Sequence, residues 1–465
     1  MKVLLTHGYF ISEDEKEKTI MKPYPPLGIL YIAAWLERHG IQCQVYDTTF
    51  STKAELKLSL EKSPPILIGI YTNLMTKLNI VEIISYIKNY KVLQDSIIVI
   101  GGPDTRHNIN DYLNIGADIV VFGEGEQTML EIVKSVKAGN IEQYGHIDGL
   151  AYKYGSNIIK TKERNRIRPI DDIPNPARHK IDMQPYLDTW QSNHGISAMT
   201  ISTQRGCPYT CKWCSTAVYG QSYRRRSPQK VVEELTHLIE EYNPDSFWFV
   251  DDVFTVSHKW LKDFRDIIQE RNLQLNYECI TRADRMNEDV IMWLKESGCF
   301  RVWIGAESGS QKVIDLMDRR VDVHQVRRMI QLSNKQGIET GTFIMLGYPG
   351  ETEEDIIETL NHLKESEPTH YTITVAYPIK GTGLYEQIDI EQNESLNWNH
   401  TTDRDRNVIR QYSKSYYRFA MGWIREELAL HKKIQNNSSL TSPSLLRHVV
   451  RSWIYRSGMR ILKRI

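Results

Sequence analysis

Short apolar runs alternate with amphipathic segments along most of the 465-residue chain, and this alternation restricts the fold more than any other feature of the sequence. Nearly continuous apolar strands that are separated by helices are typical of a parallel sheet covered on both faces. The first five runs therefore predict an α/β domain at residues 1–142, with a doubly wound, flavodoxin-like sheet and a ligand crevice beyond the carboxyl ends of its strands. These runs are Val3–Thr6, Cys43–Tyr46, Ile66–Tyr71, Ile97–Ile100 and Ile119–Phe122.

The third, fourth and fifth of these strands end in loops suited to a bulky ligand: TNL, GGPD and GEGE. Because glycine lacks a β-carbon, a glycine-containing backbone can come close to a ligand. Tight turns between strands and helices also require glycine, so the loops alone leave a purely structural role open. The candidate ligand-binding residues in these loops are Thr72, Leu74, Gly101, Gly102, Gly123 and Glu124.

A second alternating series begins after a proline-rich linker at residues 143–194. Its six strands predict a partial (β/α) TIM-like barrel over residues 195–390, whose site would lie at the C-terminal ends of the strands. The predicted strands are Met199–Thr203, Phe247–Val250, Tyr277–Thr281, Arg301–Gly305, Thr342–Leu346 and Tyr371–Ala376. The remaining residues, 391–465, are expected to form a helical, basic C-terminal region.

Composition narrows the classes of protein to consider. Lys and Arg together number 58, as do Asp and Glu, so the net charge gives no reason to expect a nucleic-acid partner. No apolar run approaches the roughly 20 residues that span a bilayer, and the N-terminus does not have the features of a signal peptide. With only six cysteines and no export signal, the expected location is the reducing cytoplasm.

The C-terminal residues 445–465 contain six Lys or Arg and no acidic residue. A basic helix with an apolar face can lie on an anionic membrane. It can equally dock on the protein with a solvated basic face, and Gly458 weakens it as a helix. Peripheral membrane contact is therefore one of two expectations here. The apolar residues that fall roughly on one helical face are Leu446, Val449, Val450, Trp453 and Ile454.

Three of the six cysteines lie within RGCPYTCKWCS, directly after the first strand of the second series. Cys207, Cys211 and Cys214 have no fourth ligand nearby, since His194 and His237 are far along the chain. A structural zinc site normally uses four Cys or His ligands, and a disulfide would leave one thiol over in the wrong compartment. An iron–sulfur cluster is usually held by four thiolates, so three would leave one iron open to bind a small molecule.

The CxxxCxxC spacing resembles the signature of radical S-adenosylmethionine (SAM) enzymes. This resemblance implies a [4Fe–4S] cluster on Cys207, Cys211 and Cys214, with the amino and carboxylate groups of SAM on the open iron. Reductive cleavage of SAM then leaves a 5′-deoxyadenosyl radical, which takes a hydrogen from the substrate. The reduction calls for an electron donor of the flavodoxin or ferredoxin type.

The resemblance covers residues of about 195–390 and assigns further SAM-binding residues. Trp213 stands where the family has an aromatic residue beside the adenine, and Glu307 in IGAESGS matches its ribose-binding carboxylate. Asp251 and Asp252 in WFVDD would hold the methionine amine, although Asp251 could equally cap the next helix. Arg282 would pair with the methionine carboxylate or a substrate group, or form an ordinary ion pair at the barrel rim.

Two later motifs complete the expected adenine pocket. GTFIMLGYPGET resembles the family's glycine-rich motif, in which Gly347 and Glu351 would shape the turn. AYPIKGTGLYE, which begins just before Tyr377, looks like the motif whose backbone closes the pocket.

The N-terminal domain resembles the cobalamin-binding domain that precedes the barrel in one large subgroup of this family, which includes anaerobic cyclases and cobalamin-dependent methyltransferases. PPLGILYIAAWL, IGIYTNL, VIGGPD and VVFGEGE match the loops of that subgroup in order. The D-x-H-x-x-G motif of the wider cobalamin-binding family is missing, because Asp104 and His107 have the wrong spacing. Many members of the subgroup also lack it, so cobalamin is expected to bind without a protein histidine on cobalt.

These motifs lead to one principal hypothesis and two alternatives. The principal hypothesis is a radical SAM enzyme that acts on an unactivated carbon of a small natural-product-like or lipid-like substrate, by cobalamin-dependent methylation or by ring formation. The first alternative is a cobalamin-independent dehydratase that deoxygenates a sugar or an aminocyclitol. The second is a redox-sensing or structural metal site without radical chemistry.

Overall fold

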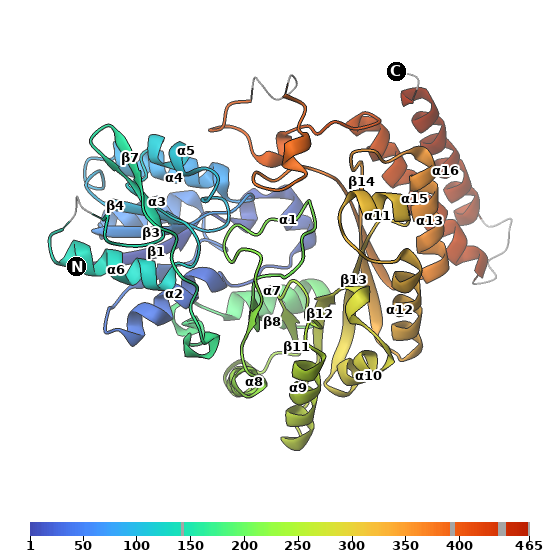
Figure 1. Ribbon diagram of the computed structural model, residues 1–465, viewed down its shortest axis with the longest axis horizontal. Coiled ribbons are helices and arrows are strands. Elements are labelled where there is room, and N and C mark those ends of the chain that lie inside the picture. Colours follow the sequence, from blue (N-terminus) through green and yellow to red (C-terminus); the bar gives the residue numbers. More distant parts are fainter. Residues whose placement is uncertain (141–143, 391–395, 436–442, 464–465) are drawn as a thin grey trace. The chain divides into compact units, whose positions relative to one another are not determined.

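The computed structural model describes residues 1–140, 144–390, 396–435 and 443–463 (Figure 1). The chain divides into two compact units. The first contains Met1–Pro208, Ser215–Trp248 and Ser395–Asp405, and the second contains Tyr209–Cys214, Phe249–Glu394 and Arg406–Ile465. The cysteine-rich loop therefore passes from the first unit into the second.

A seven-stranded sheet with the order β2-β1-β3-β4-β5-β6-β7 forms the centre of the first unit. Strands β1 to β5 pair in parallel, while β6 and β7 add an antiparallel edge. The order 2-1-3-4-5 is that of a flavodoxin-like sheet, so the predicted fold class is confirmed for this unit. The strands are β1 (Val3–His7), β2 (Gln44–Tyr46), β3 (Leu67–Tyr71), β4 (Ile97–Gly101), β5 (Ile119–Val121), β6 (Leu150–Tyr154) and β7 (Asn157–Lys160).

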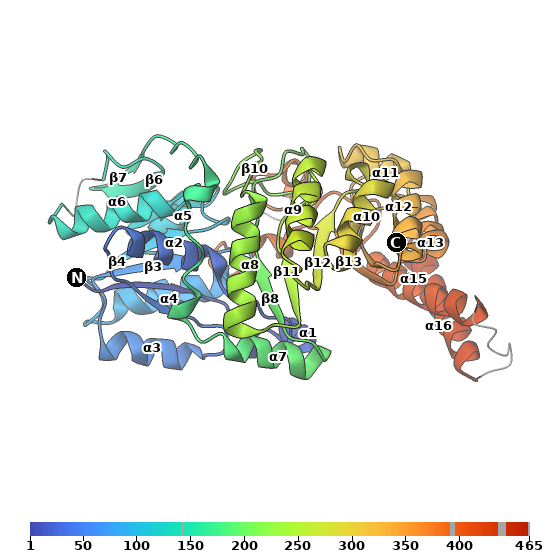
Figure 2. The same cartoon turned by 90° about the horizontal axis from the view of Figure 1, so that it is seen from below.

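Helices cover both faces of this sheet (Figure 2). Side chains alternate across a strand, so Leu5 packs on one face and its neighbour Leu4 on the other. The two faces thus bury separate apolar clusters, as the continuous apolar strands predict. The covering helices are α2 (Leu27–Arg38) and α6 (Glu126–Lys137) on one face, and α3 (Lys53–Lys62), α4 (Lys77–Asn89) and α5 (Ile109–Asn114) on the other.

The segment predicted as a linker, residues 143–194, is more regular than its prolines suggest. It contributes the β6–β7 hairpin to the sheet and ends in helix α7 (Gln184–His194). Gly155, in the turn of the hairpin, has a φ of +58°, a conformation that glycine adopts without strain. Regular secondary structure therefore continues through much of the segment predicted as a linker.

The second series of strands has the order β15-β14-β13-β12-β11-β8, and β12 to β15 pair in parallel. A helix lies between each strand of this series and the next, which confirms the predicted βα series. The strands are β8 (Ala198–Ile201), β11 (Ser246–Phe249), β12 (Tyr277–Thr281), β13 (Cys299–Glu307), β14 (Glu339–Leu346) and β15 (His370–Val375). The helices are α8 (Pro228–Tyr242), α9 (His258–Glu270), α10 (Glu288–Glu296), α11 (Gln311–Leu316), α12 (Val323–Lys335) and α13 (Glu353–Ser366).

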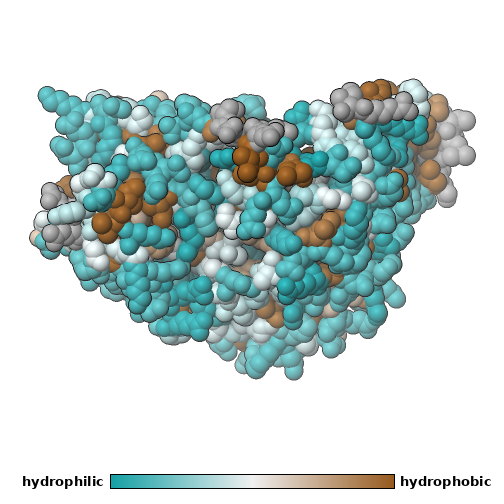
Figure 3. Space-filling view, turned by 45° about the horizontal axis from the view of Figure 1, so that its top comes forward, coloured by the Kyte–Doolittle hydropathy of each residue, from teal (hydrophilic) through white to brown (hydrophobic). Residues whose placement is uncertain are grey.

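The C-terminal region is helical, as expected, and consists mainly of two long helices in the second unit. Helix α15 (Lys414–Gln435) packs against α13 and β15, and α16 (Pro443–Leu462) packs on α15 (Figure 1). No helix within the described part of the chain is both long and apolar enough to cross a bilayer. In the view of Figure 3 the surface is largely hydrophilic, with hydrophobic side chains gathered in a few patches.

Short elements complete the structure. They are α1 (Glu15–Ile20), β9 (Gln204–Arg205), β10 (Arg224–Arg225) and the 3-10 turns η1 (Ile11–Glu13), η2 (Ile170–Asp172), η3 (Arg178–Lys180), η4 (Ala283–Arg285), η5 (Tyr385–Gln387) and η6 (Asp403–Asp405).

Candidate functional site

The base of the cysteine loop is a small antiparallel ribbon in the first unit. Strand β9 pairs with β10, and Cys207, two residues after β9, forms a single bridge with Gln221. Gly206 has a φ of +84°, and a β-carbon there would lie 2.4 Å from the Ser222 hydroxyl oxygen. Only glycine therefore fits the turn that delivers Cys207, which explains the RGC sequence.

The second half of the loop belongs to the other unit and is fixed by its backbone. The Lys212 N–H donates to the carbonyl of Met317 (3.0 Å), and the Lys212 carbonyl accepts from the Leu384 N–H (2.8 Å). Cys211 and Cys214 are joined by a turn in which the Cys214 N–H donates to the Cys211 carbonyl (3.1 Å). No disulfide joins any of the six cysteines in the described structure.

Two buried arginines lie beside Cys211. Arg282, at the end of β12, places Nη1 3.4 Å from the Cys211 Sγ, and its Nη2 donates to the Arg319 carbonyl (2.7 Å). A hydrogen bond with Cys214 and the charges of Arg319 and Arg282 together lower the pKa of Cys211 to about 6, against the effect of burial. The loop is thus built to hold a thiolate, the form in which cysteine binds a metal.

Among the described residues, no three His, Cys, Asp or Glu side chains converge closely enough to hold one metal ion. An iron–sulfur cluster makes a different demand, because its thiolates bind different iron atoms. Three cysteines on one loop that form no disulfide, with cationic side chains beside Cys211, fit such a cluster. The donor set therefore suits a three-thiolate cluster site.

Glu307 ends β13 in a strained conformation. Its φ is +66°, and the pairing of β13 with β14 shifts register between Gly305 and Glu307, which is a β-bulge. Burial raises the pKa of Glu307, while Arg319, whose Nη1 is 3.5 Å from Oε1, opposes the rise. A non-glycine residue with positive φ at a strand end is typical of a functional site, where a bulge redirects a side chain.

Arg319, which sequence reasoning did not single out, connects several predicted site residues. Its guanidinium carbon lies 5.6 Å from the centre of the Trp213 ring, and Nη2 donates to the Gly305 carbonyl (2.6 Å). Its Nε is buried without a hydrogen-bond partner in the described structure. Trp213 in turn packs against an apolar cluster that includes Leu384. Arg319, Trp213, Glu307, Arg282 and Cys211 thus form one connected group.

The remaining predicted SAM-binding residues lie at neighbouring strand ends of the second unit. Asp251 is buried and Asp252 is exposed, both just after β11. Asp251 is not a helix cap, because α9 begins at His258 and is capped by the side chain of Ser257. Arg282 also makes the ordinary ion pair considered from the sequence, with Asp284 at 2.8 Å.

The turn after β14 is held by a buried carboxyl group, as the motif predicts. Gly347 has a φ of +76°, and its N–H donates to Glu351 Oε2 (2.5 Å). Burial raises the pKa of Glu351 to about 8, and its Oε1 lacks a hydrogen-bond partner among the described residues. Arg410 donates to the carbonyls of Gly347 and Ala376, next to the half-buried Tyr377.

The six predicted cobalamin-binding residues divide into two groups. Thr72 and Glu124 are buried and bonded to the protein: the Thr72 hydroxyl lies 2.9 Å from that of Tyr112. The other four remain partly exposed at the carboxyl ends of β3, β4 and β5, where a flavodoxin-like sheet binds ligands. These are Leu74, Gly101, Gly102 and Gly123.

Glu124 instead belongs to a buried ion-pair network in the first unit. Its carboxylate lies 3.1 Å from Arg205 Nη1 and 2.8 Å from Arg224 Nη2, and it accepts from the Ile167 N–H (2.8 Å). Arg205 also bonds Glu126. Burial alone would raise the pKa of Glu124, but Arg224 and Arg205 hold it below its usual value. The network ties the loop after β5 to the ribbon that carries Cys207.

The sequence also gives no sign that residues 396–405, which follow the second series of strands, belong to the first unit. The Trp398 ring meets the Tyr112 ring edge-on at 4.9 Å, and its Nε1 donates to Asn108 (3.2 Å). Lys77 lies 4.0 Å above the same indole ring and donates to the Thr401 carbonyl (2.7 Å). Residues 396–405 therefore border the loops that follow β3 and β4.

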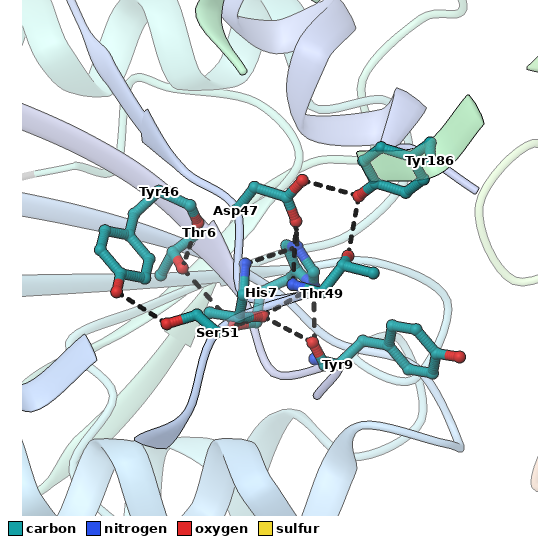
Figure 4. A network of polar contacts seen from close by, with 9 residues as sticks. Thr6, His7, Tyr9, Tyr46, Asp47, Thr49, Ser51 and Tyr186 are labelled. Carbon is teal, nitrogen blue, oxygen red and sulfur yellow. Dashed lines mark hydrogen bonds and ion pairs between the residues drawn. The ribbon is translucent and has the colours of Figure 1, made fainter. Parts of the chain in front are cut away.

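His7, at the end of β1, lies in a polar network (Figure 4). Its Nε2 is 2.9 Å from Asp47, and its Nδ1 accepts from the Tyr9 N–H (3.2 Å) and lies 3.1 Å from the Thr48 hydroxyl. The Tyr186 hydroxyl donates to the other oxygen of Asp47 (2.6 Å). Both ring nitrogens thus have protein partners, so this histidine connects β1, the loop after β2 and helix α7.

Two family models match the chain in separate regions. Residues 201–363 match the radical SAM superfamily, and residues 18–133 match the B12-binding domain. The first match contains the cysteine loop, Arg282 and Glu307, and the second contains β2 to β5 with their loops.

Curated relatives resemble most of the chain. An uncharacterized methyltransferase, PH0819, from Pyrococcus horikoshii is 29% identical over 87% of both chains. An anaerobic magnesium-protoporphyrin IX monomethyl ester cyclase from Cereibacter sphaeroides is 24% identical over 83% of this chain and 64% of its own length. A cytidylyl-2-hydroxyethylphosphonate methyltransferase from Streptomyces wedmorensis is 25% identical over 78% of this chain and 77% of its own.

Solved structures share the fold. The cobalamin-dependent SAM radical enzyme OxsB, with aqua-cobalamin and SAM bound, superimposes with a TM-score of 0.73 at 16% identity, over 99% of this chain and 71% of its own. The radical SAM methyltransferase TsrM from Kitasatospora setae, with tryptophan and a SAM analogue bound, gives a TM-score of 0.68 at 19% identity, over 85% and 77% of the two chains.

Proposed function

Since this chain belongs to the radical SAM superfamily and carries a B12-binding domain, we propose that it is a cobalamin-dependent enzyme that methylates an unactivated carbon of a small molecule. The observation that carries the proposal is the presence of both sites in one chain. One is the connected group of Cys211, Arg282, Arg319 and Glu307, and the other is a flavodoxin-like sheet with partly exposed glycines at its ligand edge. The methyl-transferring relatives support methylation as the outcome.

The residues of the chain have separate tasks in this proposal. Cys207, Cys211 and Cys214 would hold a [4Fe–4S] cluster, with Arg282 stabilising the Cys211 thiolate. Glu307, which has a positive φ at the bulge that ends β13, would accept hydrogen bonds from the ribose hydroxyls of SAM. When bound, the cluster and SAM supply a carbon-centred radical, and cobalamin supplies the methyl group.

Partly exposed backbone at Gly101, Gly102 and Gly123 would approach the cobalamin ring. A β-carbon at Gly102 would lie 2.2 Å from the Thr72 carbonyl oxygen, so the loops after β3 and β4 are in direct contact. His7 is bonded to Asp47 and to the backbone of Tyr9, and no D-x-H-x-x-G motif occurs in the sequence. Cobalamin would therefore bind without a histidine ligand from the protein.

The cleavage of SAM requires one electron from outside the chain, so a reduced flavodoxin or ferredoxin is the proposed donor. Ring formation is the second candidate outcome, which the similarity to the anaerobic cyclase favours. The cobalamin-independent dehydratase is not favoured, because the B12-binding match covers most of the flavodoxin-like sheet.

Isotope labelling tests the proposal in cells that do or do not express the protein, grown with methionine carrying a deuterated methyl group. Methylation predicts a metabolite that appears only with the protein and carries one labelled methyl group. A new product that has lost water or two hydrogens, without label, would contradict methylation. Purification with hydroxocobalamin adds a second readout, since a corrinoid-free protein with full activity would contradict the cobalamin requirement.

A further inference from the structure

Helix α16 presents an apolar stripe to solvent. Its positions repeat at intervals of three and four residues, which places them on one side of a helix. They include the most exposed large apolar side chains of the helix, Trp453 and Ile461, at 68% and 63% exposed. The stripe consists of Leu446, Val449, Val450, Trp453, Ile454 and Ile461.

The opposite face of α16 is fixed against α15, so the stripe does not result from loose packing. Gly458 lies where a β-carbon would be 2.3 Å from the Phe419 ring, and Gly422 of α15 meets Tyr455 in the same way. The glycine that weakens α16 by propensity therefore permits close contact between the two helices.

Polar contacts also set the rotation of α16. The Ser452 hydroxyl donates to Glu427 (2.7 Å), and His448 bonds Glu426 (2.5 Å). Near the end of the helix, Lys463 donates to Glu353 of α13 (2.8 Å). These contacts hold the stripe on the outer side, where the described residues leave it uncovered.

Charge distinguishes the partners that this surface could accept. Residues 443–463 contain no Asp or Glu, and Arg447, Arg451 and Arg460 are exposed around the apolar stripe. A second copy of the helix would bring these arginines against one another, which is unfavourable. An anionic lipid surface accepts both features, because apolar side chains enter the acyl boundary while arginines meet the headgroups.

We infer that α16 is a membrane-docking helix that lies in the plane of an anionic bilayer. The helix is about 30 Å long at 1.5 Å per residue, long enough for several side chains to insert together. The helix is not apolar enough to cross a bilayer, so the inferred contact is peripheral. This inference concerns a surface outside the reaction site and does not depend on the proposed function.

Co-sedimentation with vesicles tests the inference on the purified full-length protein. Binding is expected with vesicles that contain phosphatidylglycerol, and much less with vesicles of phosphatidylcholine alone. Replacing both Val450 and Trp453 by serine should weaken binding about tenfold or more, because two large apolar side chains no longer insert. Arg447→Gln with Arg460→Gln should weaken it about tenfold by lost attraction to the headgroups.

Val92→Ser is the matched control, since Val92 is an exposed apolar residue in the first unit and should leave vesicle binding unchanged. Circular dichroism and thermal melting of each variant verify folding. Equal sedimentation with neutral and anionic vesicles, or none with either, would overturn the inference. So would a concentration-dependent dimer that Val450→Ser/Trp453→Ser abolishes, because the stripe would then bind a second copy.

Discussion

Arg205 and Glu124 form a buried ion pair, in which Arg205 Nη1 lies 3.1 Å from Glu124 Oε1. Arg205 belongs to strand β9, two residues before Cys207, and Glu124 belongs to the loop after β5. Both side chains are almost fully buried, and Arg205 lies 5.3 Å from the rings of Tyr31 and Tyr219. The base of the cysteine loop and one edge of the flavodoxin-like sheet are thus held by the same guanidinium group.

Arg205→Met should lower the free energy of unfolding by about 3–5 kcal/mol, because it leaves two buried carboxylates, Glu124 and Glu126, without this partner. Urea denaturation under anaerobic conditions measures the change. Lys230→Met is the control: its pair with Glu233 is half exposed and should contribute at most about 1 kcal/mol. If both variants lost the same free energy of unfolding, the buried Arg205 pair would contribute no more to stability than the exposed pair.

Cys211→Ala should prevent cluster assembly, because two thiolates are too few to hold the cluster. Iron and acid-labile sulfide, measured after anaerobic reconstitution, should fall to background, and SAM should not be cleaved. Cys279→Ala is the matched control, since Cys279 is buried within β12 and belongs to no cysteine motif. Retention of the cluster and of SAM cleavage by Cys211→Ala would refute the site.

Glu307→Gln should weaken SAM binding by roughly tenfold or more, because hydrogen bonds to a charged acceptor contribute about 1.5–3 kcal/mol. Equilibrium dialysis with the reconstituted protein measures the affinity. Glu339→Gln, at the start of β14, carries the same change on an exposed residue and should leave affinity unchanged. If both variants bound SAM like the parent protein, the ribose contact would lie elsewhere.

Glu351 should make the protein less stable as the pH rises from about 5 to 8. Its pKa in the folded state is about 8, whereas an unfolded glutamate titrates near 4.5. Between these values the unfolded chain releases the proton and the folded protein keeps it, so the free energy of unfolding decreases by up to about 1.4 kcal/mol per pH unit.

Glu351→Gln should remove this contribution, since glutamine does not titrate. The measurement is the melting temperature of both proteins from pH 5.5 to 8, in which the parent should lose stability relative to the variant. Parallel pH profiles of the two proteins would show that Glu351 is ionised in the folded state over this range.

Local patterns predict the strands of both sheets, the cysteine spacing predicts the cysteine loop, and the family resemblance adds Trp213 and Glu307. These patterns do not reveal contacts between residues that are far apart in the sequence. The partners Arg205 and Glu124 are 81 residues apart, so their ion pair leaves no local signal in the sequence. The turn at Gly155 is a local signal for the β6–β7 hairpin, whereas the prolines that follow it indicate an irregular segment.

Other gaps concern single residues. Arg319 lies in an ordinary stretch of mixed charge, MDRRVD, and only the folded chain brings it to Glu307 and Trp213. The prediction that Asp251 could cap a helix fails because helix α9 starts later, after Ser257. An N-cap requires the residue at the helix boundary, and element boundaries are the least reliable part of a sequence-based prediction.

Residues 396–405 have a consequence for how the chain acquires its structure. Trp398 contacts Tyr112 and Asn108 across nearly 300 positions of sequence. During synthesis, the flavodoxin-like sheet can form early, but its surface at Lys77 and Tyr112 stays without Trp398 until the ribosome has passed that residue. A fragment that stops at residue 142 would keep every strand of the parallel sheet but would leave the surface at Lys77 and Tyr112 without Trp398. We therefore expect it to aggregate more readily than the full chain.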